Sequence, residues 1–100
     1  MCLILLAYNI HPSYRLILAA NRDEFFNRPT QSADVWPDHP DVLGGIDLQE
    51  KGTWLGVTRR GKFAAITNYR DPASWKSNAP SRGKLVSEYQ ISDVTPQSYI

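Results

Sequence analysis

Two nearly continuous apolar segments open the chain, Cys2 to Tyr8 and Tyr14 to Ala20. The residues between them, Asn9-Ile10-His11-Pro12-Ser13, have a composition that favours a turn. The pattern therefore predicts a β-hairpin. Because strands in a sheet with one wet face alternate between apolar and polar residues, unbroken apolar strands indicate a sheet that is covered on both faces.

The next twenty residues, 21–40, are polar and contain three prolines, which predicts loop with at most short strands. Three further segments have the composition of strands: Leu43 to Leu48, Thr53 to Thr58 and Phe63 to Thr67. The turns between them contain Gly52 and Gly61, the residue type that tight hairpins often need.

The pattern changes after Asn68. Residues 69–80 are predicted to be loop, and Gly83 to Tyr89 has the apolar spacing of a helix. Thr95 followed by Pro96 marks the start of another helix, yet only 97–100 follow. Since a helix of one turn needs packing partners, we interpret residues 1–100 as the N-terminal fragment of a single domain, truncated at its C-terminus.

These elements together predict an α+β fold in which mostly antiparallel strands are followed by helix. The chain has 100 residues and a formal net charge of +1, with charges of both signs interspersed. This balance offers no basic stripe, so neither nucleic acid nor a membrane surface is expected as a partner. The sequence carries no signal for an oligomeric state.

A single cysteine excludes an internal disulfide framework and a cysteine-based zinc site. The apolar run Leu3 to Ala7 is too short to span a bilayer, and no lysine or arginine precedes it as in a secretory signal. We therefore expect no integral membrane segment and a cytoplasmic location, with import into an organelle left open.

Cys2 stands directly after Met1. A small second residue normally permits removal of the initiator methionine, which leaves a thiol and a free α-amino group on one residue. The amine can accept the proton of the thiol, so Cys2 is a candidate nucleophile that carries its own base. The alternative is a small apolar residue that begins a buried strand, which is the commoner role of a lone cysteine.

A hairpin centred on Ile10 or His11 pairs Cys2 with Ala20, within about two residues. The chain continues with an amide, a guanidinium and two carboxylates: Asn21, Arg22, Asp23 and Glu24. The hairpin therefore brings these groups close to the start of the chain.

Asp23 can orient the α-ammonium group, and Arg22 favours a thiolate over a thiol. The alternative for this cluster is a solvated loop at a strand end, in which Asn and Asp side chains bond the local backbone.

Asn68 follows the predicted strand Phe63 to Thr67, and a hairpin around Arg60-Gly61 places it near Thr53. Its side-chain N–H is a candidate donor to an oxyanion. The alternative, favoured by the spacing alone, is a turn residue that begins the following loop.

The other aromatic and imidazole side chains favour structural roles. Three tryptophans, Trp36, Trp54 and Trp75, are predicted to anchor the core or loops. His11 and His39 each lie beside a proline and have no second ligand at a useful spacing, so no metal site is predicted. Either histidine is chemically able to ligate haem, although no neighbouring residue favours it.

Several motifs, taken in order, resemble the NRDE family, also called the transport and Golgi organisation 2 family. They are Met1-Cys2, Leu18 to Thr30 with its Asn-Arg-Asp-Glu core, Gly52 to Val57, Ile66 to Arg70 and Ser81 to Val86. The resemblance runs from the first residue to about Tyr89. Members of this family are typically much longer than the present chain, which agrees with the interpretation as a fragment.

The family in turn resembles the N-terminal-nucleophile hydrolases of the bile-salt hydrolase and penicillin V acylase type. This resemblance implies that the chain forms the N-terminal part of an αββα sandwich, with Cys2 as nucleophile, Asp23 as the aspartate after the second strand and Asn68 in the oxyanion hole. In those acylases an arginine lies three residues before the aspartate, where this chain has Ala20. Here Arg22 directly precedes the aspartate instead.

The resemblance leaves two functions open. One is an amidase or acyltransferase that acts on a small acyl or amide substrate and requires no cofactor. The other is a non-enzymatic factor that traffics haem or an acyl lipid and is linked to transport, secretion and Golgi organisation. A third possibility is that the fragment has no function alone, since an incomplete sandwich exposes apolar sheet faces.

Overall fold

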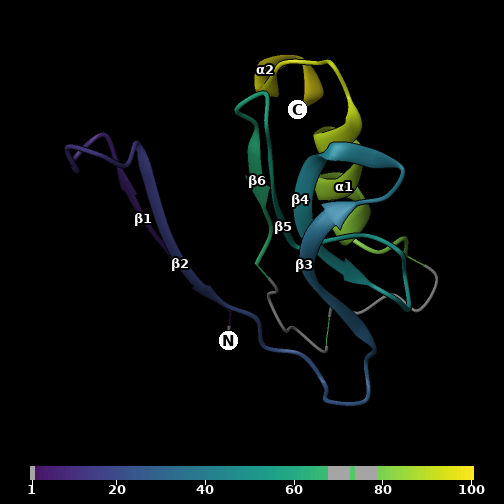
Figure 1. Ribbon diagram of the computed structural model, residues 1–100. Helices are drawn as coiled ribbons and strands as arrows, with labels where there is room; N and C mark the ends of the chain where they lie inside the picture. The colour runs from purple at the N-terminus through teal and green to yellow at the C-terminus, as the bar shows by residue number, and fades with distance from the viewer. Residues whose placement is uncertain (1, 68–72, 74–78) are drawn as a thin grey trace.

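The computed structural model describes residues 2–67, 73 and 79–100. Strands come first along the chain and helices follow (Figure 1). The elements are β1 (Leu3–Tyr8), β2 (Leu16–Asn21), β3 (Thr30–Trp36), β4 (His39–Asp47), β5 (Leu55–Thr58), β6 (Phe63–Ala65), α1 (Gly83–Ile91) and α2 (Pro96–Tyr99). The strand pairs of the described residues are antiparallel, and the predicted α+β class is confirmed.

Strands β1 and β2 form the predicted hairpin, with Leu3 opposite Asn21 and Tyr8 opposite Leu16. Continuing this ladder by one position sets Cys2 opposite Arg22, two residues from Ala20 and so within the predicted range. The difference arises because the turn extends as far as Arg15, whose carbonyl accepts the N–H of Asn9 at 2.8 Å.

The turn is held internally. His11 Nδ1 accepts the backbone N–H groups of Ser13 and Tyr14 at 3.0 and 3.2 Å, and Asn9 adopts a left-handed φ of 58°. These bonds move the centre of the turn from His11 to Pro12.

The second sheet is a four-stranded meander in the order β3-β4-β5-β6. Its first half corrects the prediction that residues 21–40 are loop with at most short strands, because β3 spans seven residues and β4 begins at His39. The sequence obscured β3 because this edge strand is almost wholly exposed and its pairing shifts between Gln31 and Asp34. Pro40 is tolerated because pairing of β4 with β5 begins only at Val42.

The remaining predicted strands and the helix are confirmed, with bounds that differ by a few residues at most of their ends. Helix α1 packs on one face of the four-stranded sheet, where Val42 is fully buried and Gln90 Nε2 donates to the carbonyl of Gly56 at 2.8 Å. Val86 and Tyr89 of α1 are also buried. The core of the described residues lies between this helix and the sheet.

Thr95 begins α2 as predicted, since its Oγ1 accepts the N–H of Ser98 at 3.3 Å. The helix contacts α1 through Tyr99, whose hydroxyl donates to the carbonyl of Leu85 at 2.7 Å and whose ring lies 5.2 Å from that of Tyr89. This contact supplies the packing partner that so short a helix needs.

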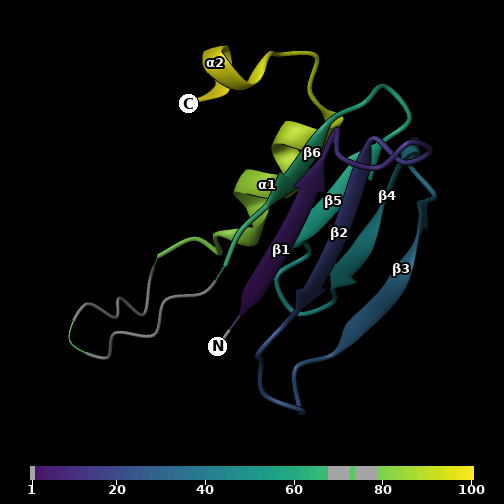
Figure 2. The same cartoon turned by 90° about the vertical axis from the view of Figure 1, so that its left-hand side faces the viewer.

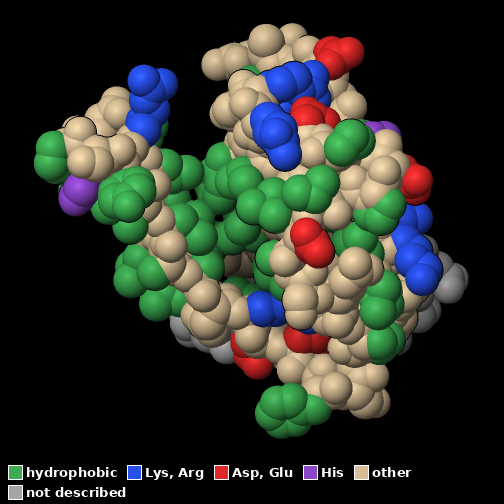
Figure 3. Space-filling view, viewed as in Figure 1, with side chains coloured by type: hydrophobic (Ala, Val, Ile, Leu, Met, Phe, Trp, Pro, Cys, Tyr) green, Lys and Arg blue, Asp and Glu red, His purple; other side chains and the backbone are tan. Residues whose placement is uncertain are grey.

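The hairpin lies beside the face of the four-stranded sheet that is opposite α1, which gives the order hairpin, sheet, helix (Figures 1 and 2). Apolar side chains gather in the hollow between hairpin and sheet, which we call the apolar cleft (Figure 3). On its sheet wall, Val57 pairs with Leu43 and Phe63, so these three side chains share the face that α1 does not cover.

Within the described residues the hairpin is not covered on both faces as predicted. Its strands carry apolar side chains with large exposed fractions: Leu3, Leu5, Leu6, Tyr8, Leu16 and Ile17. No helix in the described part of the chain is long and apolar enough to cross a membrane.

Candidate functional site

Cys2 lies directly before β1 and is partly buried. Its Sγ accepts the backbone N–H of Asp23 at 3.3 Å. Next to it, the N–H of Leu3 donates to Asn21 Oδ1 at 3.1 Å. The hairpin thus brings Cys2 and Asp23 together, as its local topology predicted.

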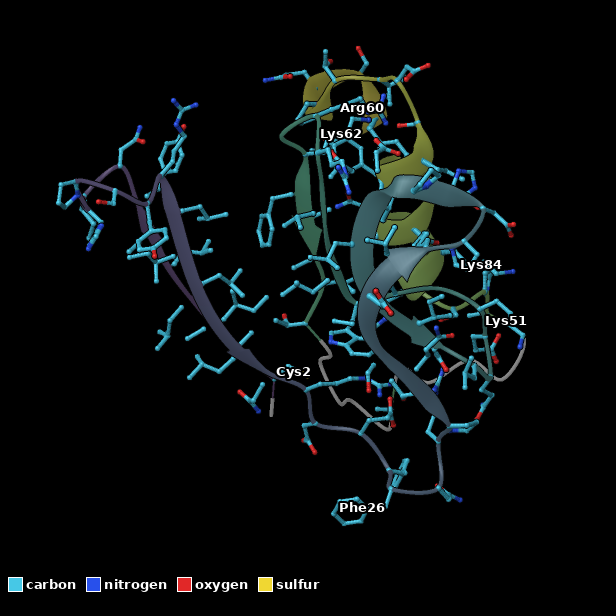
Figure 4. The ribbon with its side chains drawn as sticks, in the orientation of Figure 1. Cys2, Phe26, Lys51, Arg60, Lys62 and Lys84 are labelled. Carbon is cyan, nitrogen blue, oxygen red and sulfur yellow. The ribbon has the colours of Figure 1, made fainter. Side chains whose placement is uncertain are left out.

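The stick view places Cys2 at the strand-end side of the hairpin, near the point where the chain leaves β2 for the four-stranded sheet (Figure 4). The thiol of Cys2 is thus partly exposed and has a backbone N–H donor close to its sulfur.

Arg22 makes three contacts within the described residues. Its guanidinium carbon lies 4.1 Å from the centre of the Trp54 ring, Nη1 donates to Thr30 Oγ1 at 2.8 Å, and Nη2 lies 3.8 Å from Glu24 Oε2. The charge of Arg22 therefore rests on an aromatic face from the four-stranded sheet.

Trp54, directly before β5, was predicted only as an anchor. Its ring lies against Gly45 of β4, where an added Cβ would stand 3.0 Å from the Cη2 atom of the ring. A glycine inside a strand is the sequence signal for such a close approach, and Gly44-Gly45 carries it.

The pair Arg28–Asp47 was not found from the sequence. Arg28 Nη2 donates to Asp47 Oδ2 at 2.6 Å, and Nε lies 3.2 and 3.1 Å from the two carboxylate oxygens. Asp47 Oδ1 also accepts the N–H of Gln49 at 3.1 Å. This fork joins the loop after β2 to the end of β4.

Burial tends to raise the pKa of Asp47, but the hydrogen bonds from Arg28 and the backbone N–H of Gln49 outweigh it and hold this pKa below its usual value. The same hydrogen bond raises the pKa of Arg28. The fork is therefore ionised at neutral pH.

Asn68, the predicted oxyanion donor, lies outside the described residues. The hairpin between β5 and β6 differs by one residue from the register expected for a turn around Arg60-Gly61, because Leu55 lies opposite Ala65. The N–H of Ile66 donates to the carbonyl of Trp54 at 2.9 Å. The role of Asn68 stays a prediction.

Across 2–67, 73 and 79–100, no three or more His, Cys, Asp or Glu side chains are grouped so that they could hold a metal ion. His11 serves the hairpin turn through its Nδ1, and His39 begins β4 rather than lying in a loop. These positions, in the hairpin turn and at the start of β4, do not bring either histidine next to Cys2.

The sequence matches the model of the family Transport and Golgi organisation 2 over residues 1–100. The chain therefore belongs to the Transport and Golgi organisation 2 family, as its motifs predicted.

Individual relatives agree with this assignment. The Transport and Golgi organization protein 2 homolog of Bos taurus is 47% identical over 107 residues, which cover 100% of this chain and 38% of the relative. The Mus musculus homolog is 46% identical over the same coverage. Transport and Golgi organization protein 2 of Drosophila melanogaster is 40% identical over 98 residues, which cover 89% of this chain and 34% of the relative. The chain thus spans well under half the length of these relatives.

Proposed function

We propose that this chain carries the nucleophile of an N-terminal cysteine amidase or acyltransferase. The observation that supports it best is the hydrogen bond from the N–H of Asp23 to the sulfur of Cys2, 3.3 Å long. A donor at this position favours negative charge on sulfur, the form in which a cysteine attacks a carbonyl. We place this activity in the cytoplasm, where a thiol stays reduced.

The reaction begins after Met1 has been removed. The α-amino group of Cys2 takes the thiol proton, and Sγ bonds to the carbonyl carbon of an amide or thioester. The leaving amine or thiol takes that proton as its bond to carbon breaks, which leaves an acyl group on Sγ. Water or an acceptor amine then attacks the acyl group and restores the thiol, so no cofactor is needed.

Two further groups complete this proposal. The carboxylate of Asp23 orients the ammonium form of the α-amino group while the proton is held there. Asn68 donates its side-chain N–H to the oxyanion, a role that comes from the resemblance to the acylases.

The test uses the full-length protein and intact mass spectrometry. We expect the mass to lack Met1, and an acyl thioester probe to add one acyl group that maps to the N-terminal peptide. Cys2→Ala should abolish this addition while leaving the thermal unfolding midpoint close to that of the wild type. Retention of Met1, or acylation that survives Cys2→Ala, would overturn the proposal.

The apolar cleft favours a second candidate, a non-enzymatic factor that carries haem or an acyl lipid in connection with transport and Golgi organisation. Its sheet wall exposes Leu43 by 45%, and the hairpin exposes Leu6 by 57%. Apolar surface of this extent marks a binding site or an interface. Haem titration of the full-length protein should then give a saturable absorbance change at one haem per chain, whereas a linear response that never saturates would count against this candidate.

A further inference from the structure

We infer that Trp54 is a positioning residue for Cys2, acting through Arg22 and the peptide N–H of Asp23. This inference rests on the proposed function of Cys2 as a nucleophile. Trp54 lies directly before β5 of the four-stranded sheet, and Cys2 lies directly before β1 of the hairpin. The coupling therefore joins residues that border two separate sheets.

Trp54 is held by one backbone hydrogen bond and by one contact of its ring. Its backbone carbonyl accepts the N–H of Ile66 at 2.9 Å, which ties the residue to the strand ladder. One edge of the ring lies on Gly45, where a Cβ would come within 3.0 Å of Cη2 and 3.3 Å of Cζ2. The ring is therefore a fixed surface, and only the absence of a side chain at Gly45 makes room for it.

Arg22 lies on the face of this surface, with its guanidinium carbon 4.1 Å from the ring centre. A second hold comes from Thr30 at the start of β3, whose Oγ1 accepts from Nη1 at 2.8 Å. Since Arg22 directly precedes Asp23, fixing its side chain restricts the peptide unit that joins the two residues.

That peptide unit carries the N–H that reaches the sulfur of Cys2. The chain of contacts therefore runs from the Trp54 ring to Arg22, from Arg22 to the Asp23 N–H and from there to Sγ. This chain of contacts also explains why an arginine directly precedes Asp23. At this position the guanidinium contacts Trp54, Thr30 and Glu24, and the Arg22 backbone thereby orients the N–H of Asp23.

The test measures the rate at which iodoacetamide alkylates Cys2 in the full-length protein from pH 6 to pH 10, with the label located by peptide mass. We expect Trp54→Leu to slow alkylation at pH 7 by about tenfold, the effect of losing one hydrogen bond to a charged group, and to move the rise of the rate to higher pH. The alkylation rate of Trp54→Phe should lie between the rates of the wild type and of Trp54→Leu, because phenylalanine keeps a smaller aromatic face.

Trp36→Phe is the matched control. Trp36 is a buried tryptophan of the same sheet, and its Nε1 donates to the carbonyl of Gly44 at 3.0 Å. We expect this variant to lower the thermal unfolding midpoint without moving the pH profile. An unchanged profile in Trp54→Leu, or an equal shift in Trp36→Phe, would overturn the inference.

If Trp54→Leu does not fold, Arg22→Lys tests the same coupling. A lysine ammonium lacks the flat, forked guanidinium that contacts the Trp54 ring and Thr30 at the same time. The profile of Arg22→Lys should shift in the direction expected for Trp54→Leu, and an unshifted profile would again refute the role. Alkylation needs no acyl substrate, so these outcomes are independent of whether the acyl-transfer proposal succeeds.

Discussion

Asp47 shows how a single buried carboxylate organises the loop after the hairpin. Its side chain is only 9% exposed, yet it stays charged because the Arg28 fork and the N–H of Gln49 satisfy its oxygens. The lysine that follows the turn, Lys51, takes a left-handed φ of 67°, and its N–H donates to the carbonyl of Asp47 at 2.7 Å. One residue therefore holds both the loop and the turn between β4 and β5.

The lowered pKa of Asp47 gives a stability that depends on pH. The ionised form is favoured in the folded chain, so its contribution is fully present above the ordinary value of 3.8 and is lost as the pH falls through the folded value. We expect Asp47→Asn to lower the free energy of unfolding by about 2 kcal/mol at pH 7 and by much less at pH 3. Urea denaturation at both pH values measures the difference.

Asp38→Asn provides the matched control, since Asp38 is exposed in the turn between β3 and β4. It should change the free energy of unfolding by less than about 0.5 kcal/mol at either pH. An equal loss for Asp47→Asn at pH 7 and at pH 3 would show that the charge of Asp47 contributes nothing.

The residues near Cys2 illustrate which contacts a sequence can predict. Asp23 was expected there because a hairpin is local and its turn could be recognised. The contacts of Arg28 with Asp47 and of Arg22 with Trp54 depend on the pairing of β3, β4 and β5, which spans many residues. Because the sequence predicts loop with at most short strands where β3 lies, it predicts neither contact.

At the scale of elements, the clearest feature is that α1 receives its C-terminal cation from another element. The last turn of α1 contains no basic residue. Lys62, from the turn before β6, donates to the carbonyl of Tyr89 at 3.1 Å, to Ser92 Oγ at 3.2 Å and to the carbonyl of Ser92. Its Nζ also lies 4.4 Å from the centre of the Tyr89 ring.

Lys62→Met should therefore destabilise the packing of α1 on the sheet. We expect a loss of about 1 kcal/mol, since the change removes the cation from the negative end of the helix dipole and leaves carbonyls without this donor. Thermal unfolding followed by circular dichroism measures it. Lys84→Met, at the exposed start of the same helix, should have little effect or stabilise slightly, and a loss as large as that of Lys62→Met would contradict the capping role.

The approach of α1 to the turn between β4 and β5 requires Gly52. A Cβ at this position would lie 2.6 Å from the carbonyl carbon of Gly83, the first residue of α1, so backbone must move. We expect Gly52→Ala to cost about 1–3 kcal/mol, as overpacking does, in chemical denaturation.

Gly61 supplies the contrast for this prediction. Its φ is +90° and nothing lies within 4 Å of an added Cβ, so its requirement is conformational. Gly61→Asn should be tolerated better than Gly61→Ala, because asparagine visits left-handed backbone more readily. If Gly52→Asn were tolerated in the same way, close packing at Gly52 would not be the cause.

Over the described part of the chain, the hairpin stands away from the body formed by the four-stranded sheet and α1 (Figure 1). The radius of gyration is 14.4 Å, larger than the value of about 13 Å typical of a compact domain of this length. The apolar strands of the hairpin were correctly recognised from the sequence. The surface that packs on these strands could not be predicted, because the local pattern of residues does not specify it.

The exposed walls of the apolar cleft predict how the 100-residue chain behaves in solution. Contiguous apolar surface binds hydrophobic dyes and favours self-association. We expect this chain to enhance the fluorescence of anilinonaphthalene sulfonate and to show an apparent mass that rises with concentration in sedimentation velocity. Longer chains of the family, in which added residues can cover the cleft, should show both effects more weakly.

One substitution on the sheet wall separates the cleft from exposed apolar residues in general. Leu43 is 45% exposed on that wall, whereas Ile10 is 78% exposed in the hairpin turn. If dye binds in the cleft, Leu43→Ser should reduce the fluorescence enhancement by more than half, and Ile10→Ser should leave it nearly unchanged despite removing the more exposed side chain. Equal reductions would mean that the dye binds scattered exposed apolar residues. The apolar cleft would then not be the dye-binding surface.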